Sequence, residues 1–244
     1  MSLKRTLKHK AGETAVLLGN EAIARGALEA GLYLAAAYPG TPSTEIVESL
    51  SEVADDVGIY VEWSVNEKVA FEVAYGAAIS GAFSLVAMKH VGLNVAADPL
   101  MSSAYTGVEG ALVVVSADDP SMWSSQNEQD NRIYGVHAYI PVLEAGHPLE
   151  LKDLTKFAFR FSHDVKHPVI LRSTTRLSHT RIPVKLGPLS EPVKGGTFRK
   201  APERYVLVPA NARELRKKLI IKWGEIERYI ESSDINRIEG EGEV

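Results

Sequence analysis

Short apolar runs alternate with helical patterns along most of the chain. Runs of the length of buried strands, rich in Val, Leu, Ala and Ile, occur at residues 15–19, 32–38, 60–65, 84–90, 111–117, 140–145 and 167–174. Regular alternation of this kind predicts an α/β fold, in which an open parallel sheet carries helices on both faces. The run ALVVVSA at 111–117 is the most apolar, which predicts a central strand covered on both sides.

Several segments between these runs have the spacing of helices. TEIVESLSEVADDVG is predicted to be a helix with Pro42 in its first turn and Thr41 or Ser43 as its cap. Asn66 is predicted to cap the helix EKVAFEVAYGAAISG. MKHVGLN is interpreted as the end of a strand followed by a glycine-containing turn, and SSQNEQDNRIYGV as a polar helix.

The pattern changes near residue 180. PVKLGPLSEPVKGGTFRKAPE has four prolines and little periodicity, which indicates a linker or wrapping arm. A long charged helix follows, with an apolar stripe formed by Leu215, Leu219, Ile220, Trp223 and Ile226. We expect this stripe to pack on a partner or a second domain. The predicted organisation is a polar arm (1–14), an α/β domain (15–182), and an arm and helix (183–244).

Composition narrows the function classes. Hydrophobic residues make up 45% of the 244 residues and charged residues 24%, with a formal net charge of -4 and no basic stripe. This balance argues against nucleic-acid binding. No apolar run is long enough to span a membrane, and no apolar segment follows the basic N-terminus as in a signal peptide. The absence of cysteine excludes disulfides and cysteine-ligated clusters on this chain, and it is consistent with a cytoplasmic protein.

Common ligand-binding motifs are missing. No G-x-G-x-x-G follows the first strand, and there is no Walker A sequence and no G-x-S-x-G turn. The seven histidines lack the spacing of a metal site. Asp118-Asp119-Pro120 could suggest a metal, but a turn that ends the preceding strand is the better interpretation. We therefore expect no metal site on this chain.

Three stretches carry a family resemblance. They are GNEAIARGALEAG with AYPGTPSTEI, then EWSVNEKVAFEVAYGAAISGA, then MKHVGLNVAADPLMSSAYTGV running on through VVVSADDPSMWSSQNEQDNR. Together they resemble the 2-oxoacid:ferredoxin oxidoreductase family, and its indolepyruvate branch most closely. The resemblance covers about residues 15–180. It implies the fold of the pyrimidine-binding domain of thiamine-diphosphate enzymes.

The resemblance also implies a division of labour. In this family one domain binds the aminopyrimidine ring of thiamine diphosphate, and another binds the diphosphate through Mg²⁺. No acidic Mg²⁺–diphosphate motif and no cysteine-rich segment occur in this sequence. We therefore expect Mg²⁺ and iron–sulfur clusters on absent segments or partners, which include a second thiamine-diphosphate-binding domain, a beta subunit and ferredoxin. An oligomer is expected, and this chain alone is expected to be inactive.

Glu67 occupies the position of the family's activating glutamate. A carboxyl hydrogen-bonded to the pyrimidine N1′ favours the imino tautomer, whose 4′-imino group accepts the thiazolium C2 proton. The cofactor carries the carbanion chemistry, and the protein sets orientation and electrostatics. A purely structural alternative exists, because a glutamate in the first turn of a helix is favourable for dipole reasons alone.

Other candidate residues border the same expected site. Thr41 and Gly40 lie in YPGTPS, where the threonine hydroxyl is implied to bind substrate or cofactor; capping a helix is the alternative. Asn94 is implied to border the cofactor, and Lys89 or His90 to meet the substrate carboxylate, unless this loop is only a solvated turn. Gln126 and Asn127 could reach the site, and Arg132 could clamp a carboxylate, whereas an ordinary surface helix is the alternative.

The resemblance predicts the oxidation of an arylpyruvate such as indolepyruvate, with coenzyme A, to acyl-CoA, carbon dioxide and reduced ferredoxin. One alternative is a pyruvate-type enzyme, although that branch usually has Y-P-I-T-P where this chain has YPGTP. Another alternative is a non-catalytic assembly subunit that keeps only the fold. The intact glutamate argues against the latter, and the missing second domain argues for it.

Overall fold

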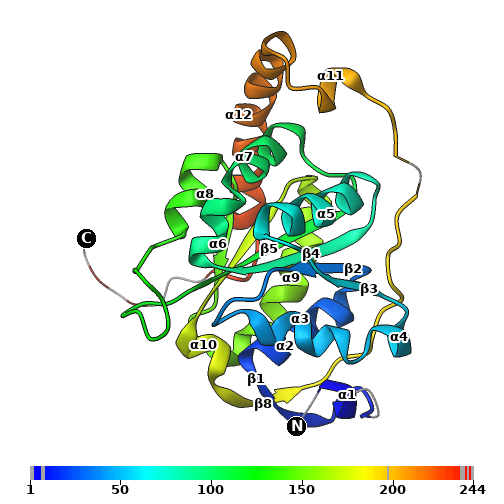
Figure 1. Cartoon of the computed structure of the whole chain (residues 1–244), viewed down its shortest axis with the longest axis vertical. Coiled ribbons are helices and arrows are strands. Elements are labelled where there is room, and N and C mark those ends of the chain that lie inside the picture. Colours follow the sequence, from blue (N-terminus) through cyan, green and yellow to red (C-terminus); the bar gives the residue numbers. More distant parts are fainter. Residues whose placement is uncertain (1–2, 7–8, 197, 237–239, 241, 243–244) are drawn as a thin grey trace.

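Six parallel strands form the centre of the molecule (Figure 1). The computed structural model describes residues 3–6, 9–196, 198–236, 240 and 242. The strand order across the sheet is β3-β2-β4-β5-β7-β6. In chain order the strands are β2 (Leu34–Ala37), β3 (Tyr60–Trp63), β4 (Phe83–Lys89), β5 (Ala111–Asp118), β6 (Val142–Glu144) and β7 (Val169–Thr174). The predicted open parallel sheet is confirmed, and β5 lies in it with every residue buried.

Alternate strand residues face two separate helical layers. Val113 and Val115 belong to one apolar cluster, whereas Leu112 and Val114 belong to the other. The first layer contains α2 (Gly19–Ala30), α3 (Thr44–Ser51) and α9 (Leu151–Val165). The second contains α5 (Glu67–Ile79), α6 (His90–Val95), α7 (Ala97–Thr106) and α8 (Arg132–Ala138). Because strand side chains alternate, these helices bury both faces of the sheet.

The first predicted strand lies outside this sheet. β1 (Thr14–Leu18) pairs antiparallel with β8 (Arg181–Lys185) in a separate two-stranded sheet. Its alternate residues are exposed, as is typical of a strand with one covered face. The remaining short elements are α1 (Leu3–Thr6), α4 (Ala54–Val57), the 3-10 turn η1 (Pro148–Glu150), α10 (Thr175–His179) and α11 (Pro202–Tyr205). Leu3 of α1 is fully buried, so the N-terminal arm contributes to the core.

The segment after β8 is the irregular arm that the prolines predicted. It runs along the outside of the sheet toward α11, and Val193 forms backbone hydrogen bonds with Gly31 and Phe83 (Figure 1). The long helix α12 (Pro209–Glu231) follows. Contrary to the expectation from sequence, its stripe packs on its own domain: Leu215, Leu219 and Ile226 are buried, whereas Ile220 is 54% exposed.

Two local predictions were wrong. The supposed turn in MKHVGLN contains the short helix α6. The supposed polar helix at 124–136 is irregular as far as Asn131, and only α8 is helical. In that stretch the side chains of Ser125 and Asn131 bond to carboxylates and carbonyls of other elements instead. Tertiary hydrogen bonds of this kind override a weak helical pattern.

Candidate functional site

Three neighbouring strands end at one edge of the sheet and deliver the candidate residues. β3, β2 and β4 are adjacent, and their carboxyl ends lead into Asn66-Glu67, the Gly40 turn and Lys89-His90 respectively. The crevice outside the carboxyl ends of parallel strands is where open α/β sheets bind ligands. The fold therefore brings Glu67, Gly40, Thr41 and Lys89 to the same edge.

Glu67 is the first residue of α5 and is half-buried. The helix begins there because the Asn66 side chain accepts a hydrogen bond of 2.9 Å from the Val69 backbone N–H, as predicted. The Glu67 side chain lies against Gly92 of α6, where an added Cβ would come within 2.6 Å of both Cγ and Oε1. The described residues give its carboxylate no hydrogen bond and no ion pair, so the group is available to a ligand.

The Gly40 turn presents Thr41 at the surface. The Gly40 carbonyl accepts hydrogen bonds from the Ser43 N–H (2.9 Å) and Oγ (2.8 Å), and its N–H donates to Thr44 Oγ1. Thr41 is exposed, and its peptide bond to Pro42 is cis. Neither Thr41 nor Ser43 caps α3 through its side chain, and Pro42 precedes the helix. The Thr41 hydroxyl therefore has no structural role of the capping kind.

Lys89 and His90 have different environments. The Lys89 side-chain carbons lie 3.1–3.5 Å from the position of a Cβ on Gly40, and Lys89 forms no ion pair with any described residue. His90 is fully buried, with Nε2 3.0 Å from the Asn127 carbonyl, and its Nδ1 lacks a partner among the described residues. Lys89 thus lies at this edge without an ion pair among the described residues, whereas His90 is buried and contacts the backbone of Asn127.

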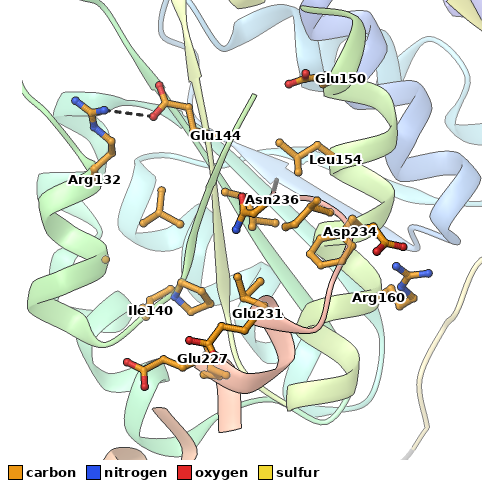
Figure 2. Close-up of a pocket in the computed structure, with 18 of the residues that line it drawn as sticks. Arg132, Ile140, Glu144, Glu150, Leu154, Arg160, Glu227, Glu231, Asp234 and Asn236 are labelled. Carbon is orange, nitrogen blue, oxygen red and sulfur yellow. Dashed lines mark ion pairs between the residues drawn. The ribbon is translucent and has the colours of Figure 1, made fainter. Parts of the chain in front are cut away.

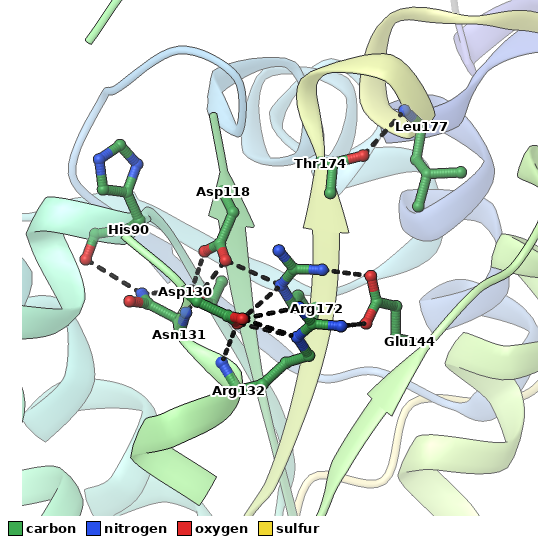
Figure 3. A network of polar contacts seen from close by, with 10 residues as sticks. His90, Asp118, Asp130, Asn131, Arg132, Glu144, Arg172, Thr174 and Leu177 are labelled. Atoms are coloured by element: carbon green, nitrogen blue, oxygen red, sulfur yellow. Dashed lines mark hydrogen bonds and ion pairs between the residues drawn. The ribbon is translucent and has the colours of Figure 1, made fainter. Parts of the chain in front are cut away.

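Asn94 and Arg132 are engaged elsewhere. Asn94 Oδ1 accepts a hydrogen bond of 2.7 Å from the Tyr134 hydroxyl. Arg132 binds the Asp130 carboxylate through Nε and Nη2 and lies 3.6 Å from Glu144 (Figure 3). Glu144 belongs to β6, at the opposite edge of the sheet from β3. The structure does not bring Arg132 together with Glu67.

A buried ionic network joins the carboxyl ends of β5, β6 and β7 (Figure 3). Arg172 Nε lies 2.8 Å from Asp118, and Nη1 contacts Glu144. Burial raises the pKa of Asp118, although the Asn131 N–H and the Arg172 guanidinium oppose the shift. Sequence reasoning missed this network, because its members come from strands far apart in the chain.

The Asp118-Asp119-Pro120 segment is a turn that ends β5. Asp119 accepts hydrogen bonds from the Thr175 hydroxyl, the Ser124 N–H and the Ser125 hydroxyl. Burial alone would raise the pKa of Asp119, but these hydrogen bonds outweigh it and hold the pKa at about 2. Across the described ranges, no three His, Asp or Glu side chains gather as metal ligands would. Nor does any helix there combine the length and apolar character that crossing a membrane requires.

Two further features of this edge were not predicted. Asn20 of α2 is fully buried and donates hydrogen bonds of 2.7 Å to the Pro42 carbonyl and to the Glu45 carboxylate. These bonds tie the Thr41 turn to α2. Trp63, Val65 and Val95 are 42–79% exposed around the strand ends. The tripeptide Trp63-Ser64-Val65 directly before the Asn66 cap was the available sign of an apolar surface next to Glu67.

Comparison with known proteins shows the family of the chain. The family model described as pyruvate flavodoxin/ferredoxin oxidoreductase, thiamine diphosphate-binding, matches residues 25–218. The chain belongs to this family. It is 53% identical over 236 residues to indolepyruvate oxidoreductase subunit IorA of Thermococcus kodakarensis, covering 95% of this chain and 36% of the relative. The IorA subunit of Archaeoglobus fulgidus is 50% identical, covering 99% of this chain and 40% of the relative.

A more distant relative and a solved structure are also similar to this chain. The 2-oxoglutarate synthase subunit KorA of Archaeoglobus fulgidus is 30% identical over 73% of this chain and 54% of the relative. A solved structure of 2-oxoglutarate:ferredoxin oxidoreductase from Magnetococcus marinus, with 2-oxoglutarate, coenzyme A and succinyl-CoA bound, superposes with a TM-score of 0.72 at 17% identity. That superposition covers 94% of this chain and 48% of the other. The chain spans well under half the length of the IorA relatives.

Proposed function

We propose that this chain supplies the aminopyrimidine side of the thiamine diphosphate site in an indolepyruvate:ferredoxin oxidoreductase. The observation that carries the proposal is the half-buried Glu67 carboxylate, without a partner among the described residues, at the ligand-binding edge of a family member's sheet. Identities of 50–53% to IorA subunits, against 30% to a KorA subunit, favour arylpyruvate over 2-oxoglutarate. The same identities, with the YPGTP turn, favour it over pyruvate.

The residues present fit the cofactor. A carboxyl group held at the start of α5 and lying against the Gly92 backbone is the kind of group that can share a proton with a ring nitrogen. When bound, thiamine diphosphate supplies the electron sink that makes decarboxylation possible. Glu67 would hold the proton at N1′, and Gly92 would keep the carboxyl in place by packing. The exposed Trp63, Val65 and Val95 would meet the domain that closes the site and excludes water.

We assign the substrate carboxylate to Lys89 rather than to His90 or Arg132. His90 is buried with one nitrogen bonded, and Arg132 already binds Asp130. Thr41, exposed one residue after Gly40, would donate its hydroxyl to substrate or cofactor, and Gly40 lets the Lys89 stem pass closely. Asn94 would contribute only after releasing Tyr134.

The overall reaction would convert a 2-oxoacid, coenzyme A and two oxidised ferredoxins into acyl-CoA, carbon dioxide, a proton and two reduced ferredoxins. The iron–sulfur clusters would lie on other segments or subunits because this chain has no cysteine, and the Mg²⁺–diphosphate site would do so because its acidic motif does not occur in this sequence. We therefore expect the chain alone to be inactive and the working enzyme to be an oligomer. A non-catalytic assembly role is the rival, and the Glu67 carboxylate, which has no partner among the described residues, argues against it.

Reconstitution tests the proposal. The chain is combined with the remaining domain and partner subunit, and viologen reduction is measured with indolepyruvate, phenylpyruvate, pyruvate and 2-oxoglutarate in turn. We expect arylpyruvates to give the highest kcat/KM, and Glu67→Gln to abolish turnover with all four. A Lys89→Met variant should raise KM more than it lowers kcat. Equal activity of the wild type and Glu67→Gln would refute the catalytic assignment.

A further inference from the structure

An open groove runs along the free edge of the sheet, at β6 (Figure 2). Its volume is about 1170 Å³, which is above the usual range of small-molecule pockets. It lies between α8 of one helical layer and α9 of the other, and the end of α12 closes one side. Glu67 follows β3 at the far edge of the sheet, so the groove is separate from the site described above.

The floor of the groove is apolar and carries an unused strand edge. Leu154, Phe157, Trp223 and Ile230 line it, and Val136, which also lines the groove, is 75% exposed. Within the described part of the chain, β6 pairs with β7 on one side only, and the preceding Pro141 carbonyl accepts from the Ile170 N–H at 3.0 Å. In a parallel ladder the N–H and C=O of Val142 then point away from β7. Neither the N–H nor the C=O of Val142 forms a hydrogen bond with another backbone group of the described residues.

The rim of the groove is acidic. Of the residues that the structure describes, six carboxylates and two guanidinium groups, those of Arg132 and Arg160, line it. The carboxylates belong to Glu144, Glu150, Asp153, Glu227, Glu231 and Asp234. Glu227, Glu231 and Asp234 form no ion pair with any described residue, and the first two lie one helical turn apart on α12 (Figure 2). This charge selects a cationic occupant, because an anionic one would meet several unpaired carboxylates.

We propose that this groove binds an extended, basic segment of a partner protein, which adds a strand to the free edge of β6. Backbone hydrogen bonds would come from Val142 and Glu144, apolar side chains would enter the floor, and Lys or Arg side chains would meet Glu227, Glu231 and Asp234. The sequence that follows Asn236, RIEGEGEV, carries three glutamates and one arginine, so its charge does not match the rim. This surface is independent of the thiamine proposal.

Binding of designed peptides to the full chain tests the inference. The probe is a fluorescent ten-residue peptide in which Val alternates with Lys, measured by anisotropy at low ionic strength. We expect Glu227→Gln/Glu231→Gln to weaken binding roughly tenfold. The matched control Glu214→Gln/Glu225→Gln removes the same charge from the same helix outside the groove and should have little effect. A peptide with Glu in place of Lys should not bind.

Backbone methylation separates strand addition from other modes of binding. Two versions of the probe carry N-methyl groups on alternate residues, in opposite phase. Strand addition predicts that one phase loses binding more than tenfold and the other keeps it, because only every second N–H faces β6. Equal binding of both phases, no binding of the Val/Lys probe, or self-association of the chain through the same residues would each overturn the proposal.

Discussion

Replacing Gly92 with alanine should displace Glu67 while leaving the fold intact. The new Cβ would lie 2.6 Å from Glu67 Cγ and Oε1, so the carboxyl must move by about 0.8 Å to reach an ordinary contact of 3.4 Å. The atoms that must yield are Cγ, Cδ and Oε1 of a flexible side chain rather than backbone atoms, and alanine favours the helix α6. A misplacement of about 1 Å in a catalytic group can cost on the order of 100-fold in rate.

The assay uses the assembled oxidoreductase. We expect Gly92→Ala to lower kcat for viologen reduction about 100-fold and to leave the melting temperature of the chain nearly unchanged. Gly76→Ala is the matched control: it lies on α5 with Glu67, and its new Cβ meets no atom within 4 Å. Full activity in Gly92→Ala, or a loss shared equally by Gly76→Ala, would refute the link between this packing contact and catalysis.

Two stability predictions follow from the buried polar groups. Arg172→Met leaves the fully buried Asp118 carboxylate without its guanidinium partner, and should lower the free energy of unfolding by about 3–5 kcal/mol in urea titrations. Arg132→Met, which removes an exposed ion pair, should lower the free energy of unfolding far less. Similar losses in the two variants would contradict this reasoning. Burial lowers the pKa of His167 to about 4, against the hydrogen bond to the Tyr139 carbonyl. The folded state therefore favours the neutral ring. The resulting contribution of His167 to the free energy of unfolding is present above pH 6.5 and is lost as the pH falls toward 4. The loss amounts to about 2 kcal/mol between pH 7 and 5. His167→Gln should flatten this part of the pH profile, while the exposed His137→Gln should not.

Local signals predicted the parts of the fold that depend on neighbouring residues. The Val-rich run of β5 is a central buried strand, and Asn66 caps α5 as its type and position indicated. In MKHVGLN, Gly92 was taken as a turn residue. Its actual surroundings explain the difference: Gly92 is helical and lacks a side chain because Glu67 occupies the space, which local sequence cannot show.

Pairings between distant segments were the part that sequence could not provide. The local sequence of β1 predicts a strand, but it does not show which strand β1 pairs with. β1 lies outside the parallel sheet because it pairs with β8, more than 160 residues later. The same holds for the site. The candidates from adjacent strand ends, Glu67, Thr41 and Lys89, share one edge, whereas Arg132 was a plausible clamp until Asp130 and Glu144 were seen to bind it.

The proton at C2 of thiamine diphosphate bound to the assembled enzyme gives the most direct test of the role of Glu67. Its exchange with deuterium, followed by rapid acid quench and NMR, reports cofactor activation before any substrate is added. The account predicts that Glu67→Gln slows this exchange at least 100-fold, whereas Glu72→Gln, an exposed glutamate on the same helix, exchanges like the wild type. Exchange at the wild-type rate in Glu67→Gln would contradict it.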